Sequence, residues 1–339
     1  MAVPADLAVV GGRLFTGLVD VASDLGVLDG EGVWVVVLPF DAPPVCARFT
    51  DVGPAPPWSA PEWDVSSWSG LDAPAWRSSL DRHGHAKGVT VIREAIVAGD
   101  VYQVNLCRRL STEVDPQADV LSLGAALAVG NPAPHSAIVR LPSAGLAVAS
   151  ASPECFLRRR GRVIESRPIK GTATNVAGLS GKDRAENVMI VDLVRNDLGR
   201  VCEHGSVEVT GLCEVERHPG LAHLVSTVRG HLRPEVDWAG ILEATFPPGS
   251  VTGAPKLAAL DLIAALEPVP RGVYCGAVGW VDAASGDGDL NVAIRTFWLA
   301  DGLLHLGTGG GITWDSVPRH EWEETELKAR GLLGVAAGP

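Results

Sequence analysis

Several features that mark common classes of protein are missing from this sequence of 339 residues. None of its six cysteines forms a C-x-x-C pair or lies near a histidine at zinc-ligand spacing, so free thiols in a reducing compartment are expected. No apolar run approaches the ~18 residues of a membrane span. The first residues lack a charged start followed by an apolar core, so we expect no signal peptide and a cytoplasmic location.

Positive charge is also scarce. The formal net charge at pH 7 is −12, which argues against nucleic acid or an anionic membrane as a partner. A site for an anion must then create its own positive potential, from a metal or from a few placed cations. Five of the 28 basic residues are lysine. Because lysine can lose its proton and arginine cannot, a retained lysine points to chemistry that arginine does not perform. The lysines are Lys87, Lys170, Lys182, Lys256 and Lys328.

The order of the expected elements indicates an α+β fold. Strand-like runs such as LAVVGGRLF, HSAIVRL and VYCGAVGWVD outnumber helical runs, and the strand–helix alternation typical of a parallel sheet is absent. Helices are expected from Lys87 to a stop at Gly99, from about Lys182 to Asp197, after TGAPK, and from about Pro318 to Leu333. The run VEVTGLCEVER is interpreted as a pair of strands. The sequence shows no internal repeat.

A segment rich in proline and serine runs from Asp51 to about Ala75. We interpret it as an irregular segment that wraps the fold, because its indoles need to be buried. The tryptophans in and next to it are Trp58, Trp63, Trp68 and Trp76.

The run VYQVNLCRRL alternates as a strand does, and this places Gln103, Asn105 and Cys107 on one face. Two amides on an otherwise apolar strand have two interpretations. They line a polar cavity, or they belong to a solvated strand face.

Two expected helices carry carboxylates at positions that favour a site. Glu186 lies on the same helical stripe as the apolar residues that follow it, and a buried carboxylate needs either an ion pair or a metal. In the last helix, Glu321, Glu324 and Lys328 fall at i, i+3 and i+7 and share a face. That face suits an anion held through Mg²⁺, or it is a solvated, salt-bridged surface. Asp197 is interpreted as a capping or surface residue.

Two glycine-rich stretches suit anion binding. LLHLGTGGGI is expected to form an antiparallel strand. GTGGGIT (307–313) is expected to follow a strand and to present backbone N–H groups to a carboxylate, and FPPGSVTGAPK (246–256) leads into a helix N-terminus. Neither contains the G-K-[ST] of a Walker loop. Arg295 is expected on a strand face with Asn291 and Ala293, where it can pair with a carboxylate through two hydrogen bonds.

The run SPECFLRRRGRVIESRPIKGT holds Glu154 and Lys170. Lys170 lies on a strand-like segment where partial burial is expected, and burial or a nearby cation favours the neutral, nucleophilic amine. Glu154 is a candidate general acid if its pKa is raised.

Taken together, these runs resemble the chorismate-utilising enzymes, specifically the synthase subunits of aminodeoxychorismate synthase and anthranilate synthase. SASPECFL, SRPIKGT, KDRAENVMIVDLVRNDLGRV, HLVSTVRG, FPPGSVTGAPK, AIRT, GTGGGI and EWEETELKA occur in the order found in that family, over about Lys87 to Leu333. The resemblance implies two facing antiparallel sheets with helices outside and the site between them. Residues 1–86 would form a short strand-rich part of this fold, and residues 87–335 the chorismate-binding catalytic region.

The resemblance also implies roles for individual residues. Mg²⁺ would be bound by Glu186 and Glu324 with Glu321 close by, and Glu154 would assist proton transfer to the departing 4-hydroxyl of chorismate. Lys170 would be the nucleophile. The substrate-binding residues would be Gln103, Thr172, His223, Thr252, Gly253, Arg295, Gly309, Gly310, Gly311 and Lys328.

Two positions distinguish among members of the family. Relatives that use water carry a lysine base where this chain has Gln103, so ammonia is the expected nucleophile. Anthranilate synthases usually carry alanine where this chain has Lys170, so the resemblance favours 4-amino-4-deoxychorismate, on the route to para-aminobenzoate. The ammonia would come from a separate glutamine amidotransferase subunit, for which the 339 residues leave no room. The alternatives are anthranilate synthase component I and a chorismate-binding protein without catalysis.

Overall fold

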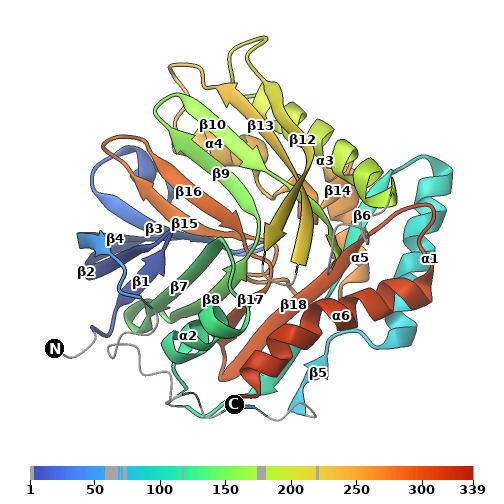
Figure 1. Cartoon of the computed structure of the whole chain (residues 1–339), viewed down its shortest axis with the longest axis horizontal. Coiled ribbons are helices and arrows are strands. Elements are labelled where there is room, and N and C mark those ends of the chain that lie inside the picture. The colour runs from blue at the N-terminus through green and yellow to red at the C-terminus, as the bar shows by residue number, and fades with distance from the viewer. Residues whose placement is uncertain are drawn as a thin grey trace.

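A computed structural model of the chain describes residues 4–57, 68, 70–71, 75–116, 118–173, 181–218 and 221–338. Antiparallel strands and helices alternate irregularly, as expected for an α+β fold (Figure 1). The strands are β1 (Leu7–Val10), β2 (Arg13–Ala22), β3 (Val33–Leu38), β4 (Val45–Pro54), β5 (Arg77–Ser78), β6 (Gln103–Glu113), β7 (His135–Leu141), β8 (Leu146–Ser152), β9 (Cys155–Arg160), β10 (Val163–Arg167), β11 (Ile169–Ala173), β12 (Glu208–His218), β13 (Leu221–His231), β14 (Gly253–Ala254), β15 (Ala277–Asp282), β16 (Gly288–Val292), β17 (Thr296–Ala300) and β18 (Leu303–Ile312). The helices are α1 (Arg82–Ala98), α2 (Val120–Gly130), α3 (Gly181–Gly199), α4 (Trp238–Thr245), α5 (Lys256–Leu266) and α6 (Pro318–Ala336), and a short 3₁₀ turn, η6, spans Gly249–Val251.

The strands form one hydrogen-bonded network that folds back on itself. One half runs β12–β13–β10–β9–β16–β15–β3–β4, with β11 paired to β13. The other half runs β2–β1–β7–β8–β17–β18–β6, and β2 joins β4 to connect the halves. The two facing sheets expected from the sequence are therefore continuous with each other. The strands before residue 86 belong to the same network, because β3 pairs with β15 and β1 with β7.

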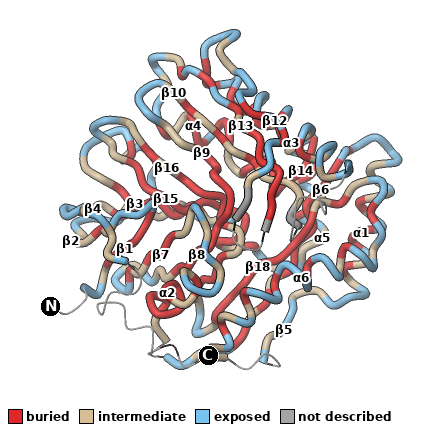
Figure 2. Tube along the Cα trace, viewed as in Figure 1, coloured by how far each residue is buried: buried red, intermediate tan, exposed pale blue. Residues whose placement is uncertain are grey.

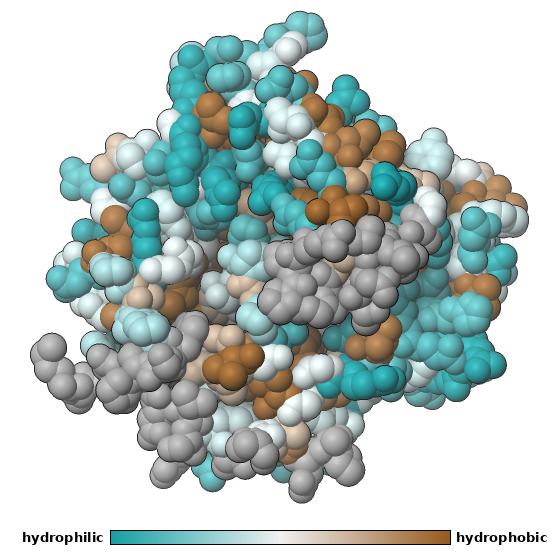
Figure 3. Space-filling model, in the orientation of Figure 1, coloured by the Kyte–Doolittle hydropathy of each residue, from teal (hydrophilic) through white to brown (hydrophobic). Residues whose placement is uncertain are grey.

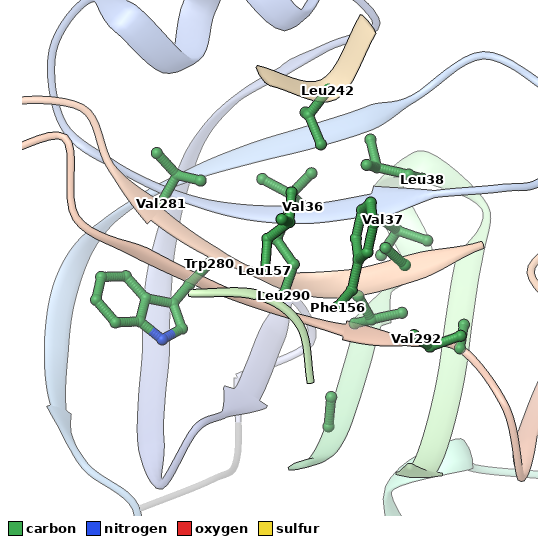
Figure 4. Packing of buried hydrophobic residues seen from close by; sticks show 14 of the residues in the cluster. Val36, Val37, Leu38, Phe156, Leu157, Leu242, Trp280, Val281, Leu290 and Val292 are labelled. Atoms are coloured by element: carbon green, nitrogen blue, oxygen red, sulfur yellow. The ribbon is translucent and has the colours of Figure 1, made fainter. Parts of the chain in front are cut away.

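The largest core cluster fills the space between the two halves of the network. It joins Ala137 and Val148 of one half to buried residues of the other half. Figure 2 shows buried chain concentrated along the strands, with exposed chain in the outer loops. Figure 4 shows the part of this cluster formed by Val36, Val37, Leu38, Phe156, Leu157, Leu242, Trp280, Val281, Leu290 and Val292. These residues come from β3, β9, β15, β16 and α4, and burial of each side chain contributes about 1.5–3 kcal/mol to the stability of this half.

The helices cover the outer faces of the network. α3 packs on β11, β12 and β13, and α6 runs along β18 (Figure 1). α2 and α6 share a second core cluster with β7, β8, β17 and β18. A third cluster joins α1 and α5 to β6. As a result, β6 and β18 are supported from outside by α1, α5 and α6.

Four helices were expected from the sequence, and capping residues determine where the first of them begins and ends. The first begins at Arg82 and not at Lys87, because Asp81 caps it by accepting from the Gly84 N–H at 2.7 Å. It ends as expected at Gly99, whose φ of 84° is left-handed. The proposed boundary between residues 86 and 87 therefore lies inside α1.

Two interpretations of strand-like runs were wrong. VEVTGLCEVER forms one strand, β12, and not a pair, because register shifts at Gly211 and near Cys213 absorb extra residues without a turn. The strand expected from LLHLGTGGGI is confirmed as β18, but GTGGGIT does not follow that strand: its glycines lie inside it, since Gly309, Gly310 and Gly311 pair in register with β6.

The tryptophan-bearing segment is only partly described. Trp68 is buried and donates its indole N–H to the Ala336 carbonyl at 3.0 Å, and half-buried Trp76 contacts Phe297. These contacts agree with a segment that wraps the fold. Trp58 and Trp63 lie outside the described residues.

The face of the molecule in Figure 3 is mostly hydrophilic, with scattered hydrophobic residues. Among the described residues, the helices are too short or too polar to cross a bilayer. All six cysteines are buried free thiols.

Candidate functional site

Glu154 lies in the break between β8 and β9, immediately after Pro153. Its backbone is fixed from two sides: its N–H donates to Ser152 Oγ at 3.2 Å, and its carbonyl accepts from the Val292 N–H at 3.0 Å. The residue is 4% exposed. Burial raises the pKa of its carboxyl to about 7, against the lowering effects of the Ser250 hydroxyl, the Lys170 charge and the Ile169 N–H. Near neutral pH this group can therefore hold or release a proton.

Lys170 is half-buried on β11, as expected from the sequence. Its Nζ donates to the Ser250 carbonyl at 3.3 Å. Ser250, buried in η6, thus contacts both predicted catalytic residues: its hydroxyl bonds to Glu154 and its carbonyl accepts from Lys170. The sequence analysis did not single out Ser250, although it noted the glycine-rich stretch that contains it.

The three predicted metal-binding carboxylates come from two helices. Glu186 lies in the second turn of α3, and Glu321 and Glu324 lie in the first turns of α6. Burial is the main cause that raises the pKa of Glu186 and of Glu321, and in both the nearby charge of Glu324 raises it further. The Lys328 charge lowers the pKa of Glu324. The structure therefore gathers a carboxylate cluster in which Glu324 carries its negative charge most readily.

Lysines surround this cluster. Lys328 Nζ is 2.7 Å from Glu324 Oε1 and donates to the Gly309 carbonyl at 3.0 Å, which fixes α6 to β18. Lys182 Nζ lies 3.7 Å from Glu186 and 3.8 Å from Glu321, so it bridges the two helices. The Lys170 charge also acts on Glu186 and Glu324. The carboxylate cluster and the Glu154–Lys170 pair therefore belong to one site.

Gly310 lies beneath the carboxylate cluster. A Cβ placed on Gly310 would lie 3.5 Å from Glu321 Oε2 and 3.8 Å from both Glu324 Oε1 and Lys328 Nζ. Glycine therefore keeps this part of β18 open below the carboxylates. The face shared by Glu321, Glu324 and Lys328 is the one predicted from their spacing. Glu321 is buried against β18, whereas about half of the Glu324 and Lys328 side chains is exposed.

Gln103 is fully buried, and neither its Nε2 nor its Oε1 has a hydrogen-bond partner among the described residues. A buried amide without partners is costly, so the position indicates a polar ligand. A Cβ on Gly311 would lie 2.7 Å from Gln103 Nε2, and a Cβ on Gly253 would collide with the Gln103 carbonyl. Gly253 has a φ of 151°, which also favours glycine. Gly311 thus leaves space for the Gln103 side chain, and Gly253 leaves space for the Gln103 backbone carbonyl.

The face of β6 that carries Gln103, Asn105 and Cys107 is buried. Asn105 is 5% exposed and its Nδ2 donates to Cys107 Sγ at 3.0 Å, so these two side chains share a face as predicted. The opposite face packs Val104 and Leu106 against helices. The interpretation as a solvated strand face is therefore wrong, and the polar cavity stays a prediction.

The predicted substrate-binding residues Thr172, His223 and Thr252 differ in their positions and contacts. Thr172 pairs in register with buried His223 across β11 and β13; the Thr172 side chain lies outside the described part of the structure. Thr252 is fully buried, and its hydroxyl donates to the Pro248 carbonyl at 3.1 Å. The Thr252 side chain therefore bonds within its own loop.

Arg295 is not on a strand, contrary to expectation. It lies between β16 and β17 with a left-handed φ of 52°, because the chain turns sharply where the Ile294 N–H donates to the Val292 carbonyl. Burial lowers the pKa of its guanidinium. Within the described parts of the chain, this guanidinium has no ion-pair partner, so it is available for an anion.

Asp197 was expected at a cap or on the surface, and it is instead buried. Its Oδ2 pairs with Lys256 Nζ at 2.7 Å, and that Nζ also donates to the Thr245 carbonyl at 2.9 Å. Asp197 and Glu154 both line one small, mainly apolar cavity of about 20 Å³. The one-dimensional helix pattern missed this pair because Lys256 lies on another helix.

A further group of metal-type ligands lies elsewhere in the described chain. Atoms of His135, Cys155 and Asp289 lie within 4.8 Å of one another. Asp289 already pairs with Arg158 at 2.8 Å and with Arg160 at 3.8 Å. Its carboxylate is therefore neutralised without an ion.

Comparison with known proteins identifies the family. The model of a family described as chorismate binding enzyme matches residues 69–334. The chain belongs to this family. Over 271 residues it is 41% identical to aminodeoxychorismate synthase component 1 of Klebsiella aerogenes, covering 76% of this chain and 59% of that protein. It is also 41% identical over 270 residues to anthranilate synthase component 1 of Streptomyces coelicolor, covering 76% of this chain and 52% of that protein.

The chain thus spans between half and two thirds of the length of these two relatives. Among solved structures, anthranilate synthase component I from Streptococcus pneumoniae TIGR4 matches with a TM-score of 0.75 and 28% identity, covering 90% of this chain and 81% of that one. The predicted α+β fold of the anthranilate and aminodeoxychorismate synthase type is confirmed.

Proposed function

We propose that this member of the chorismate binding enzyme family converts chorismate and ammonia to 4-amino-4-deoxychorismate and water, with Mg²⁺ bound at the carboxylate cluster. The observation that carries this proposal is the joint contact of Glu154 and Lys170 with Ser250. A proton donor with a pKa of about 7 and a primary amine are thereby held beside one another. The six free, buried thiols agree with a cytoplasmic location.

The chemistry of the proposed steps follows from these two groups. The Lys170 amine adds at ring C2, the ring double bond shifts, and the 4-hydroxyl leaves as water after taking a proton from Glu154. Ammonia then adds at C4 and expels the Lys170 amine from C2. Lysine is regenerated, and the net change exchanges the 4-hydroxyl for an amino group.

The carboxylate cluster fits Mg²⁺ by its donor chemistry. Mg²⁺ prefers oxygen ligands and commonly takes one or two protein carboxylates plus oxygens of its substrate. Glu186 and Glu324 would bind the ion, with Glu321 close by. When bound, the ion would hold a carboxylate of chorismate in an otherwise acidic protein, and Arg295 and Lys328 would supply the remaining positive charge.

Gln103 supports ammonia as the nucleophile over water. Its amide cannot act as a general base toward water, and its unpartnered atoms offer hydrogen bonds inside the site. The proposal includes a glutamine amidotransferase subunit as the source of ammonia.

The second candidate is anthranilate synthase component I. It is favoured by the equal identity of 41% to a relative with that name. Lys170 beside Glu154 is the feature that favours the 4-amino product. A chorismate-binding protein without catalysis is the third candidate, and it would not turn over chorismate at all.

The test is product analysis. The purified protein is incubated with chorismate, Mg²⁺ and an ammonium salt, and the products are separated by chromatography and identified by mass and absorbance. The proposal expects 4-amino-4-deoxychorismate. Anthranilate as the main product would support the second candidate, and unchanged chorismate under all conditions would support the third.

A variant with its matched control tests Lys170 directly. Lys170→Ala is expected to lose the 4-amino product and yield anthranilate or nothing. Lys87→Ala removes an exposed lysine on α1 and is expected to behave as the wild type. An unchanged product distribution in Lys170→Ala would contradict covalent participation.

A further inference from the structure

The position of α6 decides whether the proposed metal ligands meet. Glu321 and Glu324 project from its first turns over Gly310 of β18. In an α-helix each side chain points outward at a fixed angle, about 100° from the one before. A rotation of α6 about its axis would therefore turn both carboxylates away from the site. Some contact must therefore fix the rotation of this helix.

Arg108, on β6, contacts α6 at three successive points. Its Nε donates to Thr325 Oγ1 at 3.0 Å, its Nη2 pairs with Glu326, and its guanidinium lies 4.1 Å from the centre of the Trp322 ring. Trp322, Thr325 and Glu326 fall at i, i+3 and i+4 and so share one helix face. The guanidinium thus holds a whole turn of α6.

The remaining nitrogen of the Arg108 guanidinium is also bound, and the neighbouring residue on β18 reinforces the contact with α6. Nη1 donates to Ser78 Oγ at 3.1 Å, and Arg108 is 4% exposed. Thr308, the register partner of Arg108 on β18, donates its hydroxyl to the Thr325 carbonyl at 2.9 Å. Two neighbouring strands therefore hold the residue that follows Glu324.

We propose that Arg108 is a positioning residue that fixes the rotation of α6 and thereby places Glu321 and Glu324 in the site. This inference rests on the proposed role of these carboxylates in metal binding. Arg108 itself touches neither carboxylate in the described structure. Its effect passes through Trp322, Thr325 and Glu326.

The geometry requires arginine rather than any cation. A planar guanidinium can stack on Trp322 while its edge donates to several acceptors in fixed directions. A lysine ammonium in its place would reach one of these acceptors and lose the stacking. Arg108→Lys should therefore retain part of the effect, and Arg108→Met, which keeps the apolar stem, should retain none.

The experiment compares Arg108→Met and Arg108→Lys with Arg319→Met in the full chain. Arg319 is a matched control because it pairs with Glu323 on the same helix but is 73% exposed at the side chain. Hydrogen exchange of residues 318–336 is measured without chorismate, and chorismate turnover is measured over a range of Mg²⁺ concentrations.

The proposal expects faster exchange confined to 318–336 in Arg108→Met, less in Arg108→Lys, and none in Arg319→Met. It expects the half-saturating Mg²⁺ concentration of Arg108→Met to rise about tenfold to hundredfold, as when outer-shell partners of a metal site are removed, with turnover recovering at high Mg²⁺. Unchanged exchange, or faster exchange throughout the chain, would overturn it, as would an unchanged Mg²⁺ dependence in an active variant. An inactive wild type counts against the proposed function alone, because exchange needs no turnover.

Discussion

The pKa of Glu154 gives the sharpest prediction about the proposed chemistry. Burial raises it from 4.5 to about 7, which corresponds to about 3 kcal/mol in favour of the protonated form. If Glu154 donates the proton to the leaving hydroxyl, kcat/KM should be constant below this pKa and fall about tenfold per pH unit above it. Glu154→Gln should lower kcat about 10²–10⁴-fold and abolish this alkaline limb.

Ser250→Ala makes the prediction quantitative. The Ser250 hydroxyl lowers the pKa of Glu154, so its removal should raise that pKa and extend activity to higher pH. A hydrogen bond to a charged group contributes about 1.5–3 kcal/mol, which moves the limb upward by roughly one to two pH units. The substitution leaves the backbone carbonyl that accepts from Lys170.

Ser166→Ala is the control, because Ser166 lines the same cavity without a hydrogen bond to Glu154 in the described structure. Its pH profile of kcat/KM should match the wild type. A limb that stays in place in Ser250→Ala, or that moves to lower pH, would refute the assignment of that limb to Glu154.

Two further substitutions test other parts of the site. Glu324→Gln keeps the shape of the side chain but removes the charge that Lys328 stabilises, so Mg²⁺-dependent turnover should be lost; full activity would reject Glu324 as a ligand. Lys256→Met leaves Asp197 as a mostly buried carboxylate without its partner, which should lower the free energy of unfolding by about 3 kcal/mol at pH 7. The loss, measured by urea unfolding, should shrink at acidic pH as Asp197 takes up a proton, and a loss independent of pH would argue against an ion-pair origin.

Features that depend on neighbours along the chain could be predicted from the sequence. The shared face of Glu321, Glu324 and Lys328 follows from helical periodicity alone, and the structure has the ion pair between Glu324 and Lys328. The stop of α1 at Gly99 follows from the ease with which glycine adopts a left-handed conformation.

Features that depend on distant packing could not. The contact of Lys170 with Ser250 spans 80 residues, and it exists because η6 packs beside β11. The reason for the glycines of β18 could not be predicted, because glycine usually marks turns and not strands. In the structure they avoid collisions, since a Cβ on Gly307 would overlap the Tyr274 ring and one on Gly311 would crowd Gln103.

The use of lysine at the site, in a chain that otherwise prefers arginine, has a physical reason. Lys182 approaches Glu186 and Glu321 at 3.7 and 3.8 Å, and Lys328 contacts one oxygen of Glu324. An arginine would tend to bind a carboxylate through both oxygens, as the guanidinium fork favours. A lysine compensates the charge of the cluster while it leaves carboxylate oxygens free. In the proposed function, such a cluster would keep the oxygen ligands that Mg²⁺ needs while lysines balance part of its negative charge.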